Sequence, residues 1–329
     1  MKNFAHYILL LVFFAGVNSC KKDNANTTNG NITVMRPDTL GTGWSKMVLD
    51  SSASYTDIFF LNNTVGYLTG STGTYKTSDG GSSWVKASSK NFINLFVTPN
   101  GNVFAAGGTS SFAHDSVFRS SNSCNTFASQ KLDAKATDIF FVDDNNGYCF
   151  TLNSVFNTTN GGNTWNSNSN YTPAAYHNIG YCTLFFRSTT LGWCVDGNHV
   201  HKMNGNITSW QSTSAGIDTP SYSLNSIYAP SDNVVYVGNS IGQFFKSTNG
   251  GSSFNLVYTF AANTLSDIHF ISDNIGYVTS NNRIYKTTNG GSTWTVEVAL
   301  GNAVFVEIHF TDSSHGWACG NNGVILKLN

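Results

Sequence analysis

Four carboxylates recur at equivalent places along the chain, each near the start of a short apolar segment. They are Asp57, Asp138, Asp267 and Glu307, and three related segments carry Asn94, Thr183 and Ser226 at the same place. Two carboxylates that face one cleft can hydrolyse a glycosidic bond, and a ring of side-chain oxygens can hold a cation. A repeated strand-start cap would give the same column. We interpret the column as such a cap, so the sequence predicts no catalytic residue, no metal ion and no cofactor.

A second chemical signal lies at the N-terminus. Lys2 precedes an apolar run from Ile8 to Val17, which is too short to cross a membrane as a helix and is typical of a secretory signal. The run ends in the letters VNSC, of which the last is Cys20. This ending resembles the bacterial lipoprotein box, in which the cysteine is diacylated and becomes the new N-terminus. An ordinary secretory signal is the alternative.

These features predict the domain organisation. Residues 1–19 are expected to be a lipoprotein signal peptide, and Cys20 the lipid attachment site. Residues 20–40 are polar and rich in Asn and Thr, which predicts a flexible tether, and residues 41–329 form the folded domain. Lipid on Cys20 predicts the bacterial cell envelope. Lys21 favours the outer membrane, by resemblance to Gram-negative lipoproteins, and leaves open whether the domain is periplasmic or surface-exposed.

Composition excludes several classes of protein. Of the 329 residues 11 % are charged, with 17 Lys and Arg against 18 Asp and Glu, and 14 % are aromatic. So many aromatics exclude a disordered chain, and the balanced charge excludes nucleic acid as a partner. Frequent Gly, Thr, Ser and Asn favour strands and turns. Beyond Cys20 five cysteines remain, of which Cys182 and Cys194 could pair across a hairpin or both be buried thiols.

The chain is built from a repeat that must position these residues. A pattern close to Thr-x-Asn-Gly-Gly-x-Thr-Trp stands at 77–84, 158–165, 247–254 and 287–294, and in eroded form at 120–127 and 202–210. Its closing aromatic, together with Trp44, recurs about every 42 residues, which is the period of a four-stranded propeller blade.

A second series of aromatics fixes the number of blades. Seven apolar segments open the repeats at the carboxylate column, and ten residues after each column residue comes an aromatic, namely Tyr67, Phe104, Tyr148, Trp193, Tyr236, Tyr277 or Trp317. Seven openings predict an all-β fold, a seven-bladed β-propeller. After Glu307 only three strands follow, so residues 43–49 are expected to complete the last blade and close the ring.

The repeated turn resembles the Asp-box, also called the bacterial neuraminidase repeat. Its Asp or Asn can accept hydrogen bonds from backbone amides two residues on, its glycines permit positive φ, and its seventh-position hydroxyl can bond back across the turn. The acceptor side chains are Asp79, Asn160, Asn249 and Asn289. The closing aromatics, expected between sheets, include Trp84, Trp165, Phe254 and Trp294. The resemblance implies a structural turn at the periphery, away from any active site.

A single domain of seven such blades behind a lipid anchor resembles the photosystem II stability/assembly factor-like propellers, over residues 41–329. The resemblance implies an arginine-rich patch that contacts a membrane-protein client. This chain departs from it, because Arg occurs only at 36, 119, 187 and 283. We therefore expect a monomeric envelope lipoprotein that serves as a protein-binding or assembly scaffold, with an unidentified envelope protein or glycan as its partner.

A carbohydrate-active propeller is the alternative function. Sialidases share the Asp-box, but they have six blades and use three arginines around the substrate carboxylate, and Arg119 stands in a column otherwise made of lysines. Endoglucanases of the xyloglucanase type carry Asp-boxes on two propellers, with a catalytic Asp from each. The alternative thus covers a glycan-binding propeller and a sialidase-like or xyloglucanase-like glycosidase.

Three long connections are predicted to leave one face of the ring, formed by the loops between second and third strands and by the connections between blades. We name this the loop face; the long connections span residues 107–117, 166–181 and 212–223. Long loops on a rigid scaffold concentrate function, so we expect them to bind the partner. The expected binding residues are Phe112, His114, Asp115, Tyr171, Tyr176, His177, Asp218 and Tyr222.

Overall fold

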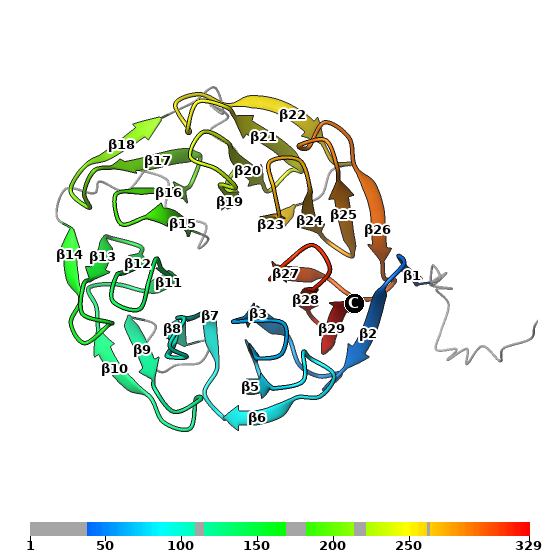
Figure 1. Cartoon of the computed structure of the whole chain (residues 1–329), viewed down its shortest axis with the longest axis horizontal. Helices are drawn as coiled ribbons and strands as arrows, with labels where there is room; N and C mark the ends of the chain where they lie inside the picture. The colour runs from blue at the N-terminus through cyan, green and yellow to red at the C-terminus, as the bar shows by residue number, and fades with distance from the viewer. Residues whose placement is uncertain (1–37, 109–114, 169–181, 214–221, 262–263) are drawn as a thin grey trace, which may run out of the picture. The chain divides into compact units, whose positions relative to one another are not determined.

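The computed structural model describes residues 38–108, 115–168, 182–213, 222–261 and 264–329. Within these ranges seven antiparallel sheets surround a common axis (Figure 1). The predicted seven-bladed, all-β propeller is therefore confirmed. No helix in the described part of the chain is long and apolar enough to span a membrane.

We number the blades along the chain; in blades 1 to 5 the strands run outward from the axis in sequence order, and in blades 6 and 7 an N-terminal strand is added on the outside. Blade 1 consists of β3 (Tyr55–Phe60), β4 (Gly66–Gly70), β5 (Gly73–Thr77) and β6 (Val85–Ser88). Blade 2 consists of β7 (Phe92–Val97), β8 (Val103–Gly108), β9 (Ser116–Ser120) and β10 (Ala128–Lys131). Blade 3 consists of β11 (Ala136–Phe141), β12 (Gly147–Thr151), β13 (Val155–Thr158) and β14 (Asn166–Asn168). Blade 4 consists of β15 (Cys182–Ser188), β16 (Leu191–Asp196), β17 (His199–Asn204) and β18 (Trp210–Thr213).

The last three blades follow the same plan, with additions from the N-terminal end. Blade 5 consists of β19 (Leu224–Tyr228), β20 (Val235–Asn239), β21 (Gln243–Ser247) and β22 (Asn255–Thr259). Blade 6 consists of β23 (Leu265–Phe270), β24 (Gly276–Ser280), β25 (Arg283–Thr287) and β26 (Thr295–Ala299), with β1 (Thr39–Leu40) on its outer edge. Blade 7 consists of β27 (Phe305–Phe310), β28 (Gly316–Gly320) and β29 (Val324–Leu328), with β2 (Trp44–Val48) as its outer strand.

The ring closes as predicted, through strand β2. It pairs antiparallel with β29, with Trp44 opposite Leu328 and Val48 opposite Val324. Blade 7 therefore takes its outer strand from one end of the chain and its other three from the other end. Such closure leaves no unpaired sheet edge between the first and last blades.

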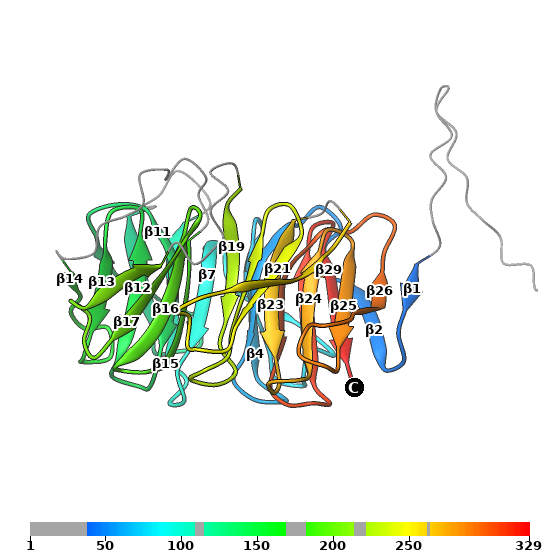
Figure 2. The same cartoon turned by 90° about the horizontal axis from the view of Figure 1, so that it is seen from above.

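Strand β1 was not predicted. Thr39 pairs with Ala299 and Leu40 with Val298 on the outer edge of β26, and β1 and β2 lie side by side at the rim (Figure 2). Asp38 adds two contacts, since its carboxylate accepts hydrogen bonds from the Lys46 ammonium (2.7 Å) and the Gly301 backbone N–H (3.0 Å). The segment expected to be a tether thus ends in a short strand bound to blade 6.

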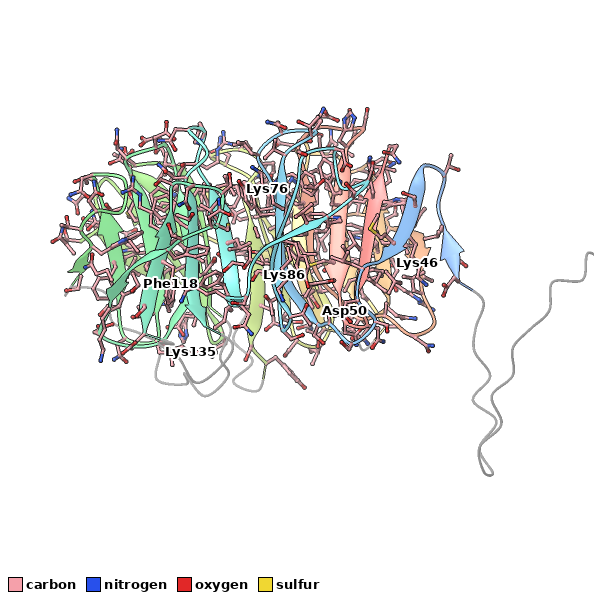
Figure 3. All side chains as sticks on the ribbon, turned by 90° about the horizontal axis from the view of Figure 1, so that it is seen from below. Lys46, Asp50, Lys76, Lys86, Phe118 and Lys135 are labelled. Atoms are coloured by element: carbon pink, nitrogen blue, oxygen red, sulfur yellow. The ribbon has the colours of Figure 1, made fainter. Side chains whose placement is uncertain are left out.

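Aromatic pairs join neighbouring blades. At five of the seven interfaces, the second-strand aromatic of one blade stacks on an aromatic near the end of the first strand of the next, as with Trp317 on Phe60, whose ring centroids are 3.5 Å apart. The equivalent pairs Tyr148–Phe186, Tyr236–Phe270 and Phe104–Phe141 have centroids 3.8, 3.9 and 3.9 Å apart. Seen from the side, side chains crowd the spaces between the strands of the ring (Figure 3). The composition noted in the sequence, rich in aromatics, thus serves blade-to-blade packing.

The repeated turn has the geometry of a closed hydrogen-bonded loop. Gly80 and Gly81 have φ of 70° and 83°, in the left-handed region that glycine adopts without strain. The Asp79 carboxylate accepts the backbone N–H of Ser83 (2.9 Å) and the Ser83 hydroxyl (2.6 Å). The backbone amide that donates to the Asp79 carboxylate therefore belongs to the residue four positions later in the chain, whereas the sequence predicted two positions. The hydroxyl of Thr77 accepts the N–H of Gly81 (2.9 Å).

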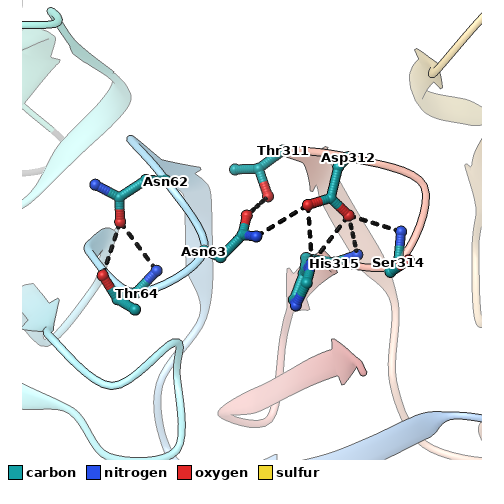
Figure 4. Close-up of polar contacts among 7 residues, drawn as sticks. All are labelled: Asn62, Asn63, Thr64, Thr311, Asp312, Ser314 and His315. Atoms are coloured by element: carbon teal, nitrogen blue, oxygen red, sulfur yellow. Dashed lines mark hydrogen bonds and ion pairs between the residues drawn. The ribbon is translucent and has the colours of Figure 1, made fainter.

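The turns of blades 1 and 5 also contact the blade before them. The indole N–H of Trp317 in blade 7 donates to the carbonyl of Gly80 in blade 1 (2.9 Å), and that of Trp193 in blade 4 donates to Gly250 in blade 5 (3.1 Å). The same face carries a polar junction between blades 1 and 7, where Asn63 donates to Asp312 (2.9 Å; Figure 4). We name this the turn face, opposite the loop face.

Candidate functional site

The seven innermost strands, β3, β7, β11, β15, β19, β23 and β27, surround one cavity of about 410 Å³. All seven residues of the carboxylate column line it, and we name them the polar ring. Its members are Asp57, Asn94, Asp138, Thr183, Ser226, Asp267 and Glu307. The propeller repeat places them together because each is the third residue of its strand except Thr183, the second residue of β15.

Members of the polar ring tie one blade to the next. The carboxylate of Asp138 in blade 3 accepts the backbone N–H of Leu184 in blade 4 (2.6 Å), and Asp267 in blade 6 accepts that of Ile308 in blade 7 (3.0 Å). Asp57 likewise accepts the N–H of Leu95 in blade 2, and Asn94 that of Ile139 in blade 3 (3.3 Å). The expected cap thus exists, but its side chains accept hydrogen bonds from backbone N–H groups of the neighbouring blade and not only from their own strand.

The carboxyl groups of the ring are hard to ionise. Burial raises the pKa of Asp138 to about 7 and that of Asp267 to about 6. Burial and the negative charge of neighbouring carboxyls raise the pKa values of Asp57 and Glu307 well above their ordinary values. Glu307 also shares a hydrogen bond with Asp267, which lowers the pKa of Asp267 and raises that of Glu307, so the protonated Glu307 is the donor.

Seven flat side chains form a second, closed ring around the same cavity. They are Phe59, Phe96, Phe140, Phe185, Tyr228, His269 and His309, each two residues after a polar-ring member, and we name them the aromatic collar. Every neighbouring pair is in contact, with ring centroids between 4.6 and 5.5 Å apart around the full circle. All seven are half-buried.

The two histidines of the collar are neutral. Burial lowers the pKa of His309 to about 4, and burial together with nearby His309 lowers that of His269 well below its ordinary value. Nε2 of His309 lies 3.0 Å from the carbonyl oxygen of Phe60, so it carries the proton and donates. Nε2 of His269 lies 3.4 Å from the Tyr228 hydroxyl. In the described part of the chain, no group of three or more His, Cys, Asp or Glu side chains is arranged to hold a metal ion.

Two of the eight predicted loop-face residues lie within the described residues. Asp115 precedes β9, forms an ion pair with Lys131 (3.2 Å), and its carbonyl accepts the N–H of Leu132 (2.5 Å). Tyr222 lies just before β19 and is 37 % exposed. The other six lie outside the described residues: Phe112, His114, Tyr171, Tyr176, His177 and Asp218.

The strand register of blade 4 bears on whether Cys182 and Cys194 pair across their hairpin. In blade 4 Cys194 lies opposite Leu184, and Cys182 lies opposite Asp196. The two cysteines are therefore displaced by two positions and are not directly opposite each other. Cys20 lies outside the described residues.

The aromatic collar was not predicted as a site. Its signal was present in the sequence, since every column residue is followed two places later by Phe, Tyr or His. Residues two apart on a strand point to the same side, so this spacing predicts two stacked rings once the propeller is recognised. For His269 and His309, which stand in a column that carries Phe or Tyr in other blades, the sequence favours packing residues.

No family model matches the sequence, and neither does any curated protein. Solved structures are similar in fold. YCF48 from Cyanidioschyzon merolae superposes with a TM-score of 0.72 at 18 % identity, over 88 % of this chain and 99 % of that one. A structure of YCF48 bound to D1 peptide gives 0.69 at 16 % identity over the same shares. The GH74 xyloglucanase from Xanthomonas campestris gives 0.67 at 12 % identity, over 88 % of this chain and 53 % of that one. At these identities the likeness shows that the chain has the propeller fold of these proteins.

Proposed function

We propose that this protein is a cell-envelope lipoprotein whose propeller binds another protein and acts as an assembly scaffold. The observation that carries the proposal is the likeness to YCF48 along 99 % of that chain. A YCF48 propeller has been solved with a bound D1 peptide. A rigid ring with long connections expected on one face is suited to the same task.

The partner surface we propose is the loop face rather than a basic patch. Each arginine in the described part of the chain is already engaged. Arg119 donates to Asn163 (2.6 Å), Arg187 contacts Asp232 (3.3 Å), and Arg283 donates to the Tyr285 hydroxyl (3.2 Å). Recognition would therefore use the aromatic and polar side chains expected on the loop face, among them Tyr222.

A pull-down from envelope extracts tests the partner surface. The full chain carrying Tyr171→Ala, Tyr176→Ala and Tyr222→Ala is expected to lose partners that the wild type retains. The matched control removes exposed apolar side chains from three outer strands: Val85→Ala, Leu256→Ala and Val296→Ala. If both triple variants recover the same proteins as the wild type, the loop face is not the binding surface.

The anchor is tested separately, by labelling cells with an alkyne-bearing fatty acid. We expect label on the wild type and none on Cys20→Ser, with the variant released from the outer-membrane fraction. Label retained on Cys20→Ser, or none on either chain, would refute lipid attachment at this residue.

A carbohydrate-active role is the second candidate, and the carboxyl groups of the central cavity motivate it. Asp57, Asp138, Asp267 and Glu307 line one cavity, and glycosidases use two carboxyl groups that face one cleft. A glycan array, followed by assay of reducing sugar released from any bound glycan, separates the candidates. Release that Glu307→Gln abolishes would support a glycosidase. Binding without release would support a lectin. If the protein neither binds nor cleaves any glycan, the scaffold function remains the proposal.

A further inference from the structure

We propose that the central cavity binds a small organic ammonium ion. The proposal goes beyond the scaffold function and does not depend on the loop face. It rests on two features that line the same cavity, the aromatic collar and the polar ring.

The collar supplies the π faces that such an ion needs. Phe185 and Tyr228 are in contact, with ring centroids 4.6 Å apart, and Phe59 and Phe96 are 4.8 Å apart on the other side of the circle. Each side chain of the collar is half-buried and lines the cavity, so several aromatic rings can contact one ligand. Cages of this kind attract quaternary and primary ammonium groups through the ring quadrupoles, by ~0.5–2 kcal/mol for each contact.

The polar ring supplies the opposite charge. Four carboxyls line the cavity, and none of its described lining residues is Lys or Arg. With both histidines neutral, ionised Asp138 and Asp267 have no cationic side chain in the cavity to balance them. The backbone N–H groups that these carboxylates accept carry no positive charge. An ammonium ligand supplies the opposite charge and offsets the cost of burying an ionised carboxylate.

An unsatisfied hydroxyl is the third observation. Ser226 lines the cavity and is 2 % exposed, and its Oγ has no hydrogen-bond partner among the described residues. Thr183, its neighbour in the polar ring, has an equally unpartnered Oγ1. Buried polar atoms normally have a partner, so these two hydroxyls on neighbouring strands of the cavity wall leave hydrogen-bonding capacity that a polar ligand group could satisfy.

The size of the cavity agrees with an organic ion. Sites for small molecules occupy roughly 300–1,000 Å³, and this cavity has about 410 Å³. A bare metal ion needs a compact set of three or more ligands, which the described residues do not form. Two sources share the chemistry: a free ammonium compound, and the lysine side chain of a protein segment.

Calorimetric titration of the full chain tests the proposal with three probes. Choline represents the free ion, its isostere dimethylbutanol replaces the nitrogen by carbon, and a blocked Gly-Lys-Gly peptide represents the protein-borne group. We expect choline or the peptide to bind at least tenfold more tightly than dimethylbutanol, and the tighter of the two identifies the source. Equal affinity for the charged and neutral probes, or no binding of any probe, would overturn the proposal.

Variants locate the binding. Asp138→Asn removes one charge, while Phe185→Leu keeps an apolar side chain but removes a π face, so either variant alone suffices if the other fails to fold. Each is expected to weaken binding at least fivefold. The matched controls are Asp232→Asn, an exposed carboxylate outside the cavity, and Tyr258→Leu on the outer strand β22. Unchanged affinity in both cavity variants, or an equal loss in the controls, would place binding elsewhere.

Affinity for the cation should also rise with pH. The titratable groups that face the cavity or its carboxyls are Asp57, Asp138, Asp267, Glu307, His269, His309, Tyr228, Cys149 and Cys319. Of these, Asp138 and Asp267 lose their protons between pH 5.5 and 7.5, with pKa values of about 7 and about 6. We expect choline to bind at least threefold more tightly at the upper pH, and a flat or inverted profile would contradict the assignment.

Discussion

The indole of Trp44 lies edge-on against the ring of Phe310, with 6.3 Å between ring centroids. Trp44 opens strand β2 near the N-terminal end of the described chain, whereas Phe310 ends β27 in the last blade. Trp44 also contacts Tyr277 of blade 6 in the same edge-on way (6.4 Å). One side chain thus joins the closing strand to two blades.

Trp44→Ala should therefore destabilise the whole ring. Trp44 is 6 % exposed, and truncating a buried Trp costs about 3–5 kcal/mol. Val48 on the same strand is 48 % exposed, so Val48→Ala should change the free energy of unfolding by less than about 0.5 kcal/mol. Urea denaturation measures both. Equal and small effects would show that β2 contributes little to closure.

The turn predicts a second test. Thr77→Val removes the acceptor of the Gly81 N–H in a buried turn, and an unsatisfied buried amide costs ~1–3 kcal/mol. Ser82→Ala is the control, because the Ser82 hydroxyl makes exposed hydrogen bonds: it donates to the Asp79 carbonyl (3.1 Å) and accepts from the Lys327 ammonium (3.2 Å). Thermal unfolding should show a clear fall in Tm for Thr77→Val and almost none for Ser82→Ala. A reversed order would contradict the described turn.

Alanine substitutions at two glycines separate the cost of backbone strain from the cost of steric overlap. Gly101 and Gly162 have φ of 82° and 74°, so an alanine at either is strained by roughly 1–2 kcal/mol. A Cβ at Gly101 would meet nothing within 4 Å, whereas one at Gly162 would overlap the Phe104 ring. That ring is fully buried and stacked on Phe141. Gly162→Ala should therefore lower stability by at least ~1 kcal/mol more than Gly101→Ala, and similar losses would count against this blade contact.

The polar ring makes stability depend on pH with a defined sign. Asp138 has a folded-state pKa of about 7 against 3.8 when unfolded, and Asp267 one of about 6. The folded state therefore binds more protons, and the stabilisation is complete below about pH 4 and is lost as pH rises through 6 and 7. The side chain in Asp138→Asn cannot ionise. An amide side chain fits this position of the polar ring, because Asn94 occupies the equivalent position in blade 2 and accepts the Ile139 N–H.

The measurement is the stability of Asp138→Asn relative to wild type at pH 5 and pH 8. The advantage of the wild type should shrink by on the order of 1–3 kcal/mol over that interval. Asp232→Asn, which changes an exposed carboxylate, should show no such trend. A constant difference between wild type and Asp138→Asn would mean that Asp138 is ionised throughout.

The architecture could be predicted because the sequence pattern of one blade recurs seven times. The column residues and the second-strand aromatics each mark a blade, and the shortage of one strand after Glu307 identified β2 as the closing strand. Strand β1 could not be found in this way, because the two residues Thr39 and Leu40 carry no periodicity and pair only with an edge that exists after folding. The contacts of Asp38 with Lys46 and Gly301 depend on that pairing.

The site was only half predictable. The column indicated that Asp57, Asp138, Asp267 and Glu307 meet, since equivalent residues of a propeller lie at the same depth. Their links to the next blade depend on the tilt of each strand, which residue types do not specify. The shared hydrogen bond of Asp267 with Glu307 likewise follows from burial in the assembled ring.

The central claim, that the loop face binds a partner protein, is tested most directly by site-specific photo-crosslinking in cells. The crosslinking amino acid p-benzoylphenylalanine would replace Tyr222 on the loop face, Val85 on the rim or Ser252 on the turn face, all of which are exposed. We predict a discrete crosslinked protein from position 222 and none from 85 or 252. No product at 222, or the same products at all three positions, would contradict the account.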